Sequence, residues 1–78
     1  MEINIASLQK LWKYLPKDFG KQVAEEFNCS ASMARYVRDL KDPDMTKMRV
    51  QTRKIMLFMA ELAKQNKDEV DKINSLAS

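Results

Sequence analysis

The most informative stretch runs from residue 20 to residue 40 and reads GKQVAEEFNCSASMARYVRDL. Phe19, Val23 and Phe27 follow one another at intervals of four residues, which is the spacing of one helical face. Asn28 predicts the end of this helix, because asparagine tolerates a left-handed backbone better than most residues. Ser30 predicts the N-cap of a second helix. The apolar residues of that second helix are Met33, Ala34, Val37 and Leu40.

The residues before this stretch predict an earlier helix from about Ser7, as its N-cap, to Leu15. Its apolar residues are Ile5, Leu8, Leu11, Trp12 and Leu15. Pro16 ends this helix, because the residue before a proline disfavours the α conformation. Asp18 then predicts the cap of the helix that contains Phe19.

The residues after the stretch predict a turn and then a long helical segment. The second helix of the stretch is expected to end near Lys41, because Asp42-Pro43-Asp44 is a turn sequence. From about Thr46 the chain has neither glycine nor proline and is expected to be helical almost to its end. One apolar stripe of this segment consists of Met48, Thr52, Ile55, Met59 and Leu62. The stripe weakens near Asn66, which leaves open one long helix or two.

Composition predicts a single small all-α domain over residues 1–78. The chain has one glycine and two prolines and is 45% hydrophobic, which favours a bundle of four to five helices over a fold with many turns. The net charge is +3. Residues 1–54 hold 11 basic and 7 acidic residues, net +4, and residues 55–78 hold 3 and 4, net −1. An N-terminal region with this excess of basic residues favours a polyanionic partner.

Several function classes lack the residues they need. With one cysteine and no histidine, we expect no disulfide, no metal site and no cofactor, and we expect Cys29 to lie in the core. Acid–base and phosphoryl chemistry lack their usual groups, so we expect no enzyme. No apolar run approaches the ~18 residues of a membrane span, and residues 1–4 do not open a signal peptide. These features predict a cytoplasmic protein without a membrane partner.

Residues 20–40 also meet the physical demands of a helix-turn-helix. Ala24 is a small residue for the helix crossing, Asn28 replaces the usual turn glycine, and Ser30 caps the second helix. The crossing is expected to be buried by Val23, Phe27, Cys29, Ala34 and Val37.

This pattern resembles the helix-turn-helix of lambda repressor, Cro and related XRE-like phage and bacterial regulators, over about a quarter of the chain. Residues 54–63 also resemble the helix that follows the motif in short bacterial regulators.

The resemblance implies a DNA-binding transcriptional regulator, with the second helix, about residues 30–41, in the major groove. Arg35 is the best candidate for base reading, because its planar fork matches two acceptors of guanine. The implied base-reading residues are Ala31, Ser32, Arg35 and Tyr36. The implied phosphate contacts are drawn from Lys17, Lys21, Gln22, Arg38, Lys41, Lys47 and Arg49. Asp39 is expected to lie off the interface or to pair with a neighbouring arginine.

The implied partners are double-stranded DNA and a second copy of the chain, since repressors commonly pair to read two half-sites. We expect the C-terminal segment to pack on the other helices before Leu62 and part of the remainder to form the dimer. Three alternatives stay open: a plain helical hairpin, binding of RNA or of DNA without sequence preference, and a protein-interaction module such as an inhibitor or adaptor. The last would use the methionine-rich C-terminal helix, although Met45, Met48, Met56 and Met59 are also typical of an adaptable core.

Overall fold

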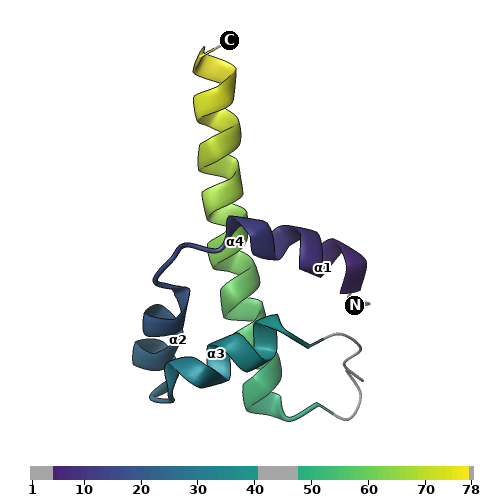
Figure 1. Cartoon of the computed structure of the whole chain (residues 1–78), viewed down its shortest axis with the longest axis vertical. Coiled ribbons are helices and arrows are strands. Elements are labelled where there is room, and N and C mark those ends of the chain that lie inside the picture. The colour runs from purple at the N-terminus through teal and green to yellow at the C-terminus, as the bar shows by residue number, and fades with distance from the viewer. Residues whose placement is uncertain (1–4, 41–47, 78) are drawn as a thin grey trace.

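The other helices of the molecule pack against one long C-terminal helix. The structure, a computed structural model, describes residues 5–40 and 48–77, and all regular elements in these ranges are helices. In chain order they are α1 (Ile5–Leu11), the 3-10 helix η1 (Trp12–Tyr14), α2 (Phe19–Phe27), α3 (Ala31–Arg38) and α4 (Val50–Ala77). Figure 1 shows α1, α2 and α3 gathered around the N-terminal half of α4. The predicted all-α class and long C-terminal helix are confirmed.

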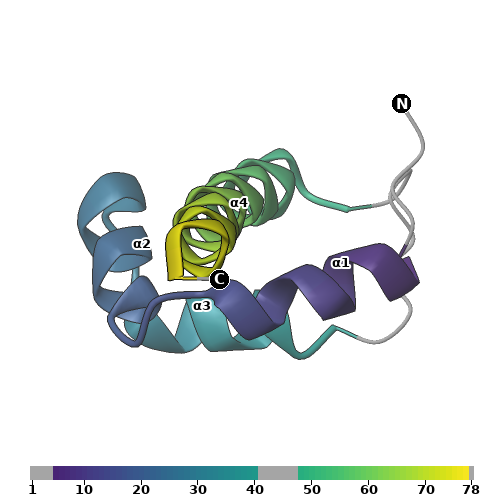
Figure 2. The same ribbon diagram turned by 90° about the horizontal axis from the view of Figure 1, so that it is seen from above.

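The core lies where α2 and α3 pack against α4. Val23 of α2, Ala34 and Val37 of α3, and Ile55 and Met59 of α4 are at most 1% exposed. Viewed along α4, helices α2, α3 and α1 lie around one side of it (Figure 2). Partly buried apolar side chains complete the cluster, namely Leu8, Trp12, Leu15, Phe27, Cys29, Met33, Leu40, Met48 and Phe58. Phe27 and Phe58 meet edge to face, with ring centroids 5.5 Å apart.

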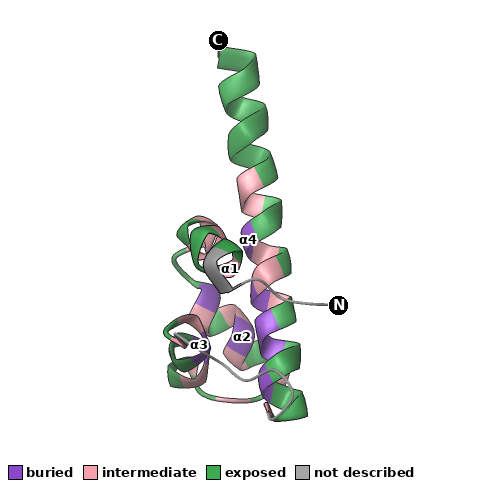
Figure 3. Ribbon diagram, turned by 90° about the vertical axis from the view of Figure 1, so that its right-hand side faces the viewer, coloured by how far each residue is buried: buried purple, intermediate pink, exposed green. Residues whose placement is uncertain are grey.

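Helix α4 is a single helix of 28 residues, with no break near Asn66. Its buried residues are Thr52, Ile55, Met56, Met59 and Ala63. Met56 and Ala63 lie outside the predicted stripe, because a helix packed against several neighbours buries a wider face than one stripe. Burial stops after Lys67, and the remaining turns of α4 are exposed (Figure 3).

The first helix differs from its prediction at the N-terminus. Helix α1 begins at Ile5, so Ser7 lies inside it and is not its N-cap. The apolar helical spacing already starts at Ile5. This spacing determines where the helix starts more strongly than the capping preference of Ser7. The C-terminal prediction is confirmed, since η1 ends at Tyr14 and Leu15 before Pro16 has extended backbone, with ψ of 134°.

Two further helix ends were predicted wrongly. Helix α3 ends at Arg38, not near Lys41. The backbone N–H of Leu40 donates to the carbonyl of Val37 at 3.4 Å, which closes the helix and brings Leu40 against the core. Helix α4 begins at Val50, so Met48 packs on the core before the helix starts. The predicted turn at 42–44, Met45 and the predicted start at Thr46 lie outside the described residues.

The turn between α2 and α3 has the backbone that the sequence predicts. Asn28 is left-handed, with φ of 52° and ψ of 49°. The backbone N–H groups of Asn28 and Cys29 both donate to the carbonyl of Ala24. The hydrogen bond from Cys29 measures 3.2 Å. Ser30 follows in extended conformation as the N-cap of α3, and its carbonyl accepts from the N–H of Met33 at 3.1 Å. The two helices are therefore joined by a turn of only three residues.

Substitutions of Asn28 test this turn. Asn28→Gly is expected to raise the free energy of unfolding by roughly 0.5 kcal/mol, because glycine adopts positive φ without steric cost. Asn28→Val is expected to lower it by about 1–2 kcal/mol, because a β-branched residue is strained there. Urea unfolding followed by circular dichroism measures both. Equal stability of the two variants would contradict a left-handed residue at this position.

Gly20 allows the first turn of α2 to lie close to the start of α3. A Cβ atom placed on Gly20 would lie 3.3 Å from the Cβ of Ala31, tighter than an ordinary van der Waals contact. Ala24, the small residue predicted for this crossing, is half-buried. The close approach at Gly20 and Ala31 was not predicted, because glycine inside a helix has no distinctive spacing signal.

Candidate nucleic-acid interface

Helix α3 has a buried face and a polar exposed face. Ala34 and Val37 pack in the core, whereas Ser32, Arg35 and Tyr36 are exposed. Positions three and four apart lie on one side of a helix, so the structure brings these three predicted base-reading side chains together. Together they form the exposed side of α3.

Arg35 and Tyr36 are the prominent side chains of this face. Tyr36 is 57% exposed although its ring is large and apolar. The guanidinium of Arg35 donates a hydrogen bond to the hydroxyl of Ser32, one turn earlier, at 3.3 Å. This weak contact holds the fork of Arg35 along the outer surface of α3, toward its N-terminus. The face thus presents planar hydrogen-bond donors, a hydroxyl and a ring side by side.

Ala31, the fourth predicted base-reading residue, lies at the edge of this face. It is half-buried, since its methyl group is next to Gly20 of α2. It is therefore less accessible to a partner than Ser32 or Arg35.

Arg38 and Asp39 form an ion pair where α3 ends. The Nε of Arg38 donates to one carboxylate oxygen of Asp39 at 3.0 Å, and a terminal nitrogen donates to the other at 3.4 Å. The guanidinium also lies over the ring of Phe19, 5.5 Å from its centroid. The predicted pairing of Asp39 with a neighbouring arginine is confirmed. Arg38 therefore links α3 to the start of α2, which reduces its availability for a phosphate.

The other predicted phosphate contacts are distributed around α2 and the start of α4. Lys17, Lys21 and Arg49 are exposed. Gln22 is half-buried, and its amide donates to the carboxylate of Asp18 at 2.9 Å. Lys41 and Lys47 lie outside the described residues.

Two exposed cations next to Arg49 were missed by the sequence analysis. Arg53 and Lys54 lie in the first turns of α4 and are exposed. The run of basic residues from Arg49 to Lys54 was the available signal. Their position lengthens the basic region at the N-terminal end of α4.

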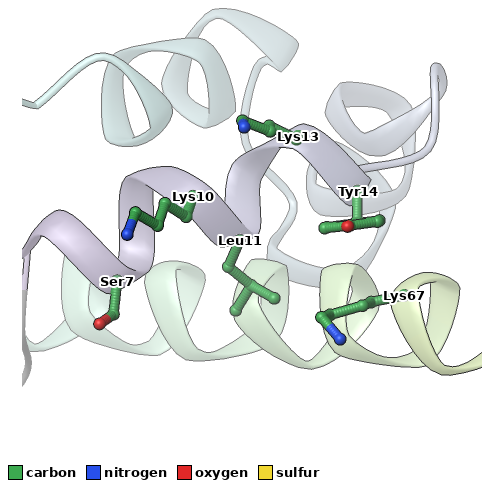
Figure 4. Close-up of a pocket in the computed structure, with 6 residues that line it drawn as sticks. All are labelled: Ser7, Lys10, Leu11, Lys13, Tyr14 and Lys67. Carbon is green, nitrogen blue, oxygen red and sulfur yellow. The ribbon is translucent and has the colours of Figure 1, made fainter. Parts of the chain in front are cut away.

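A shallow pocket of about 320 Å³ lies between α1, η1 and α4, away from this face (Figure 4). It is lined by Ser7, Lys10, Leu11, Lys13, Tyr14 and Lys67. Lys67 donates to Asp71 at 2.7 Å, and this hydrogen bond, with the attraction of the carboxylate, raises the pKa of Lys67. Its ammonium also lies 5.8 Å from the ring centroid of Tyr14. None of these six residues belongs to the predicted interface.

Comparisons with known proteins add no family. No protein-family model matches the chain, and no curated protein or solved structure matches it. No helix in residues 5–40 and 48–77 is long and apolar enough to cross a membrane. Across the same residues, no three histidine, cysteine or acidic side chains gather in a group that could hold a metal ion.

Proposed function

We propose that this chain binds double-stranded DNA in a sequence-specific way, with α3 in the major groove. Arg35 reads guanine through its planar fork, and Ser32 and Tyr36 contact neighbouring base or backbone atoms. Lys17, Lys21 and Arg49 contact phosphates. The protein acts as a cytoplasmic transcriptional regulator of prokaryotic or phage type, as a homodimer on a roughly palindromic site.

The observation that carries this proposal is the exposed face of α3 on a rigid two-helix unit. The unit is held by the left-handed turn at Asn28 and by the close approach of Gly20 to Ala31. Its buried side is wholly apolar at Ala34 and Val37, so the orientation of the outer side chains is fixed by packing. A helix presented in this way, next to exposed cations, has the parts that groove binding requires.

The experiment is selection of bound sequences from random duplex DNA, performed at about 50 mM and 200 mM salt. We expect enrichment of one guanine-containing site. With about four to six phosphate contacts, affinity should fall roughly 100-fold or more between these salt concentrations, because bound phosphates release counterions. Single-stranded RNA of random sequence serves as the competitor. Absence of binding at the lower salt concentration, or equal binding of the RNA, would refute the proposal.

A further inference from the structure

The C-terminal turns of α4 extend beyond the body of the protein. Figure 3 shows α4 with a buried face along its lower half and exposed residues throughout its upper part. Three large apolar side chains in this extension are exposed, Val70 by 36%, Ile73 by 63% and Leu76 by 78%. None of the described residues covers them. We call residues 68–77 the α4 extension.

The apolar face of the extension continues the buried face of α4. A series with alternating steps of four and three residues runs through Thr52, Met56, Met59, Ala63, Asn66, Val70, Ile73 and Ala77. The first four are buried, Asn66 is half-buried, and the last three are exposed. This is the heptad spacing by which helices pack along a shared seam. The seam is therefore covered by the chain itself up to Asn66 and uncovered after it.

Asn66 marks the boundary between the two parts of the seam. Its amide donates to the backbone carbonyl of Tyr14 in η1 at 2.6 Å. Through this contact η1 lies at the foot of the α4 extension, and Figure 1 shows α1 beside α4 at about the same level. A second helix running parallel to α4 on the same face would have to pass through α1 and η1. For a helix that arrives from the C-terminal end, antiparallel to α4, no residue in 5–40 or 48–77 is such an obstacle.

We propose that the α4 extension is the dimer interface, and that it pairs antiparallel with the same segment of a second copy of this chain. Val70 packs against Ile73 of the partner subunit, and the reverse contact follows from the two-fold symmetry. The pairing is centred between residues 71 and 72. It spans residues 67–76, about 15 Å of helix, and stops next to Asn66, where η1 contacts α4.

The charges at one edge of the seam complement each other in this pairing. Glu69 and Lys72 lie on the same side of α4, next to Ile73, at a separation of one turn. An antiparallel partner centred between residues 71 and 72 brings its own Lys72 toward Glu69, and its Glu69 toward Lys72. Two other ion pairs form within α4 itself, Lys64 with Asp68 and Lys67 with Asp71. The extension is therefore amphipathic, and its apolar edge is self-complementary in charge.

For its biological role this inference rests on the proposed function, whereas the contact itself is tested without DNA. Helix α3 crosses the lower half of α4 (Figure 1), so the dimer places its two α3 helices toward opposite ends of the particle. The two half-sites would then lie more than one turn of DNA apart, beyond the ~34 Å of adjacent major grooves.

The first test is sedimentation equilibrium of the full chain, without DNA, up to about 1 mM protein. We expect twice the monomer mass with a Kd on the order of 100 µM, because the seam is well below the roughly 1,200 Å² of a standard stable interface. Ile73→Glu is expected to weaken association at least ten-fold. Leu57→Glu is the matched control, since Leu57 is 61% exposed on α4 but lies off the seam. Circular dichroism should show both variants folded.

The second test addresses orientation. Glu69→Lys and Lys72→Glu are each expected to weaken the dimer several-fold, and the double variant is expected to restore it. Small-angle scattering of the dimer should give a maximum dimension of about 70 Å, because two molecules of 44 Å length overlap along only about 15 Å.

Three outcomes would overturn the proposal. They are a monomer at about 1 mM protein, equal effects of Ile73→Glu and Leu57→Glu, and a dimer no longer than the monomer. A dimer that binds no DNA would leave the interface standing and refute only the proposed function.

Discussion

Met59→Ala is expected to lower the free energy of unfolding by about 2–5 kcal/mol, the range for removing a long apolar side chain from a packed core. Met59 is fully buried in the N-terminal half of α4, in the same cluster as Val23 and Val37. The total free energy of unfolding of a domain of this size is roughly 4–12 kcal/mol. The variant should therefore melt at a much lower temperature, or be partly unfolded at 37 °C. Thermal and urea unfolding followed by circular dichroism measure the change.

Leu57→Ala is the matched control for this prediction. Leu57 is two residues away on the same helix and 61% exposed, so the change in stability should stay within about 0.5 kcal/mol. The pair of variants also bears on the alternative of a protein-interaction module. Met56 and Met59 are buried, so a partner surface on α4 would have to use other residues. Equal effects of the two substitutions would contradict the position of the core.

Arg35→Ala is expected to abolish preference for the selected DNA site, with a loss of discrimination of about 1–3 kcal/mol, or roughly 5–150-fold in relative affinity. The reason is that a bidentate contact to guanine distinguishes bases, whereas contacts to phosphates do not. Arg35→Lys keeps the charge but not the planar fork. It should therefore keep most of the affinity for random DNA while it loses the preference. Fluorescence anisotropy with the selected site and a scrambled duplex measures both.

Arg53→Ala is the control for loss of positive charge. Arg53 is exposed on α4, a different helix from α3, so this variant should weaken binding to the selected and scrambled duplexes alike. Arg35→Ala is expected to fold normally, because the side chain is exposed and its hydrogen bond to the Ser32 hydroxyl lies within its own helix. Unchanged site preference in Arg35→Ala would remove this residue from the reading face.

Much of the fold was predictable because it depends on local signals. The left-handed residue at Asn28, the N-caps at Asp18 and Ser30, and the effect of Pro16 all follow from backbone preferences of single residues. At both caps the side chain makes no capping hydrogen bond. Asp18 instead accepts from Gln22. The positions were therefore right, although the expected capping contacts are absent.

The remaining features depend on tertiary contacts that no local pattern encodes. Leu40 ends α3 early because its side chain packs on the core, and Met48 packs there before α4 starts. The sequence could not decide whether α4 continues past Asn66, because its polar residues there suggested a break. In the structure the Asn66 side chain donates a hydrogen bond to the backbone carbonyl of Tyr14, 52 residues earlier. Of the candidate site, the exposed face of α3 and the pairing of Asp39 with an arginine were predicted. The contact of Arg38 with Phe19 and the half-burial of Ala31 became clear only in the structure.

Because α4 is continuous, its extension depends on the folded domain for its existence. A helix of about ten residues is too short to persist in water alone, since the first turn is costly to nucleate. The buried half of α4 supplies that nucleus, and the exposed turns after Asn66 need only propagate from it. The apolar edge at Val70 and Ile73 is therefore formed only in molecules whose core has already folded. Unfolded chains would present no organised edge, so assembly would select folded molecules and in turn stabilise them by mass action.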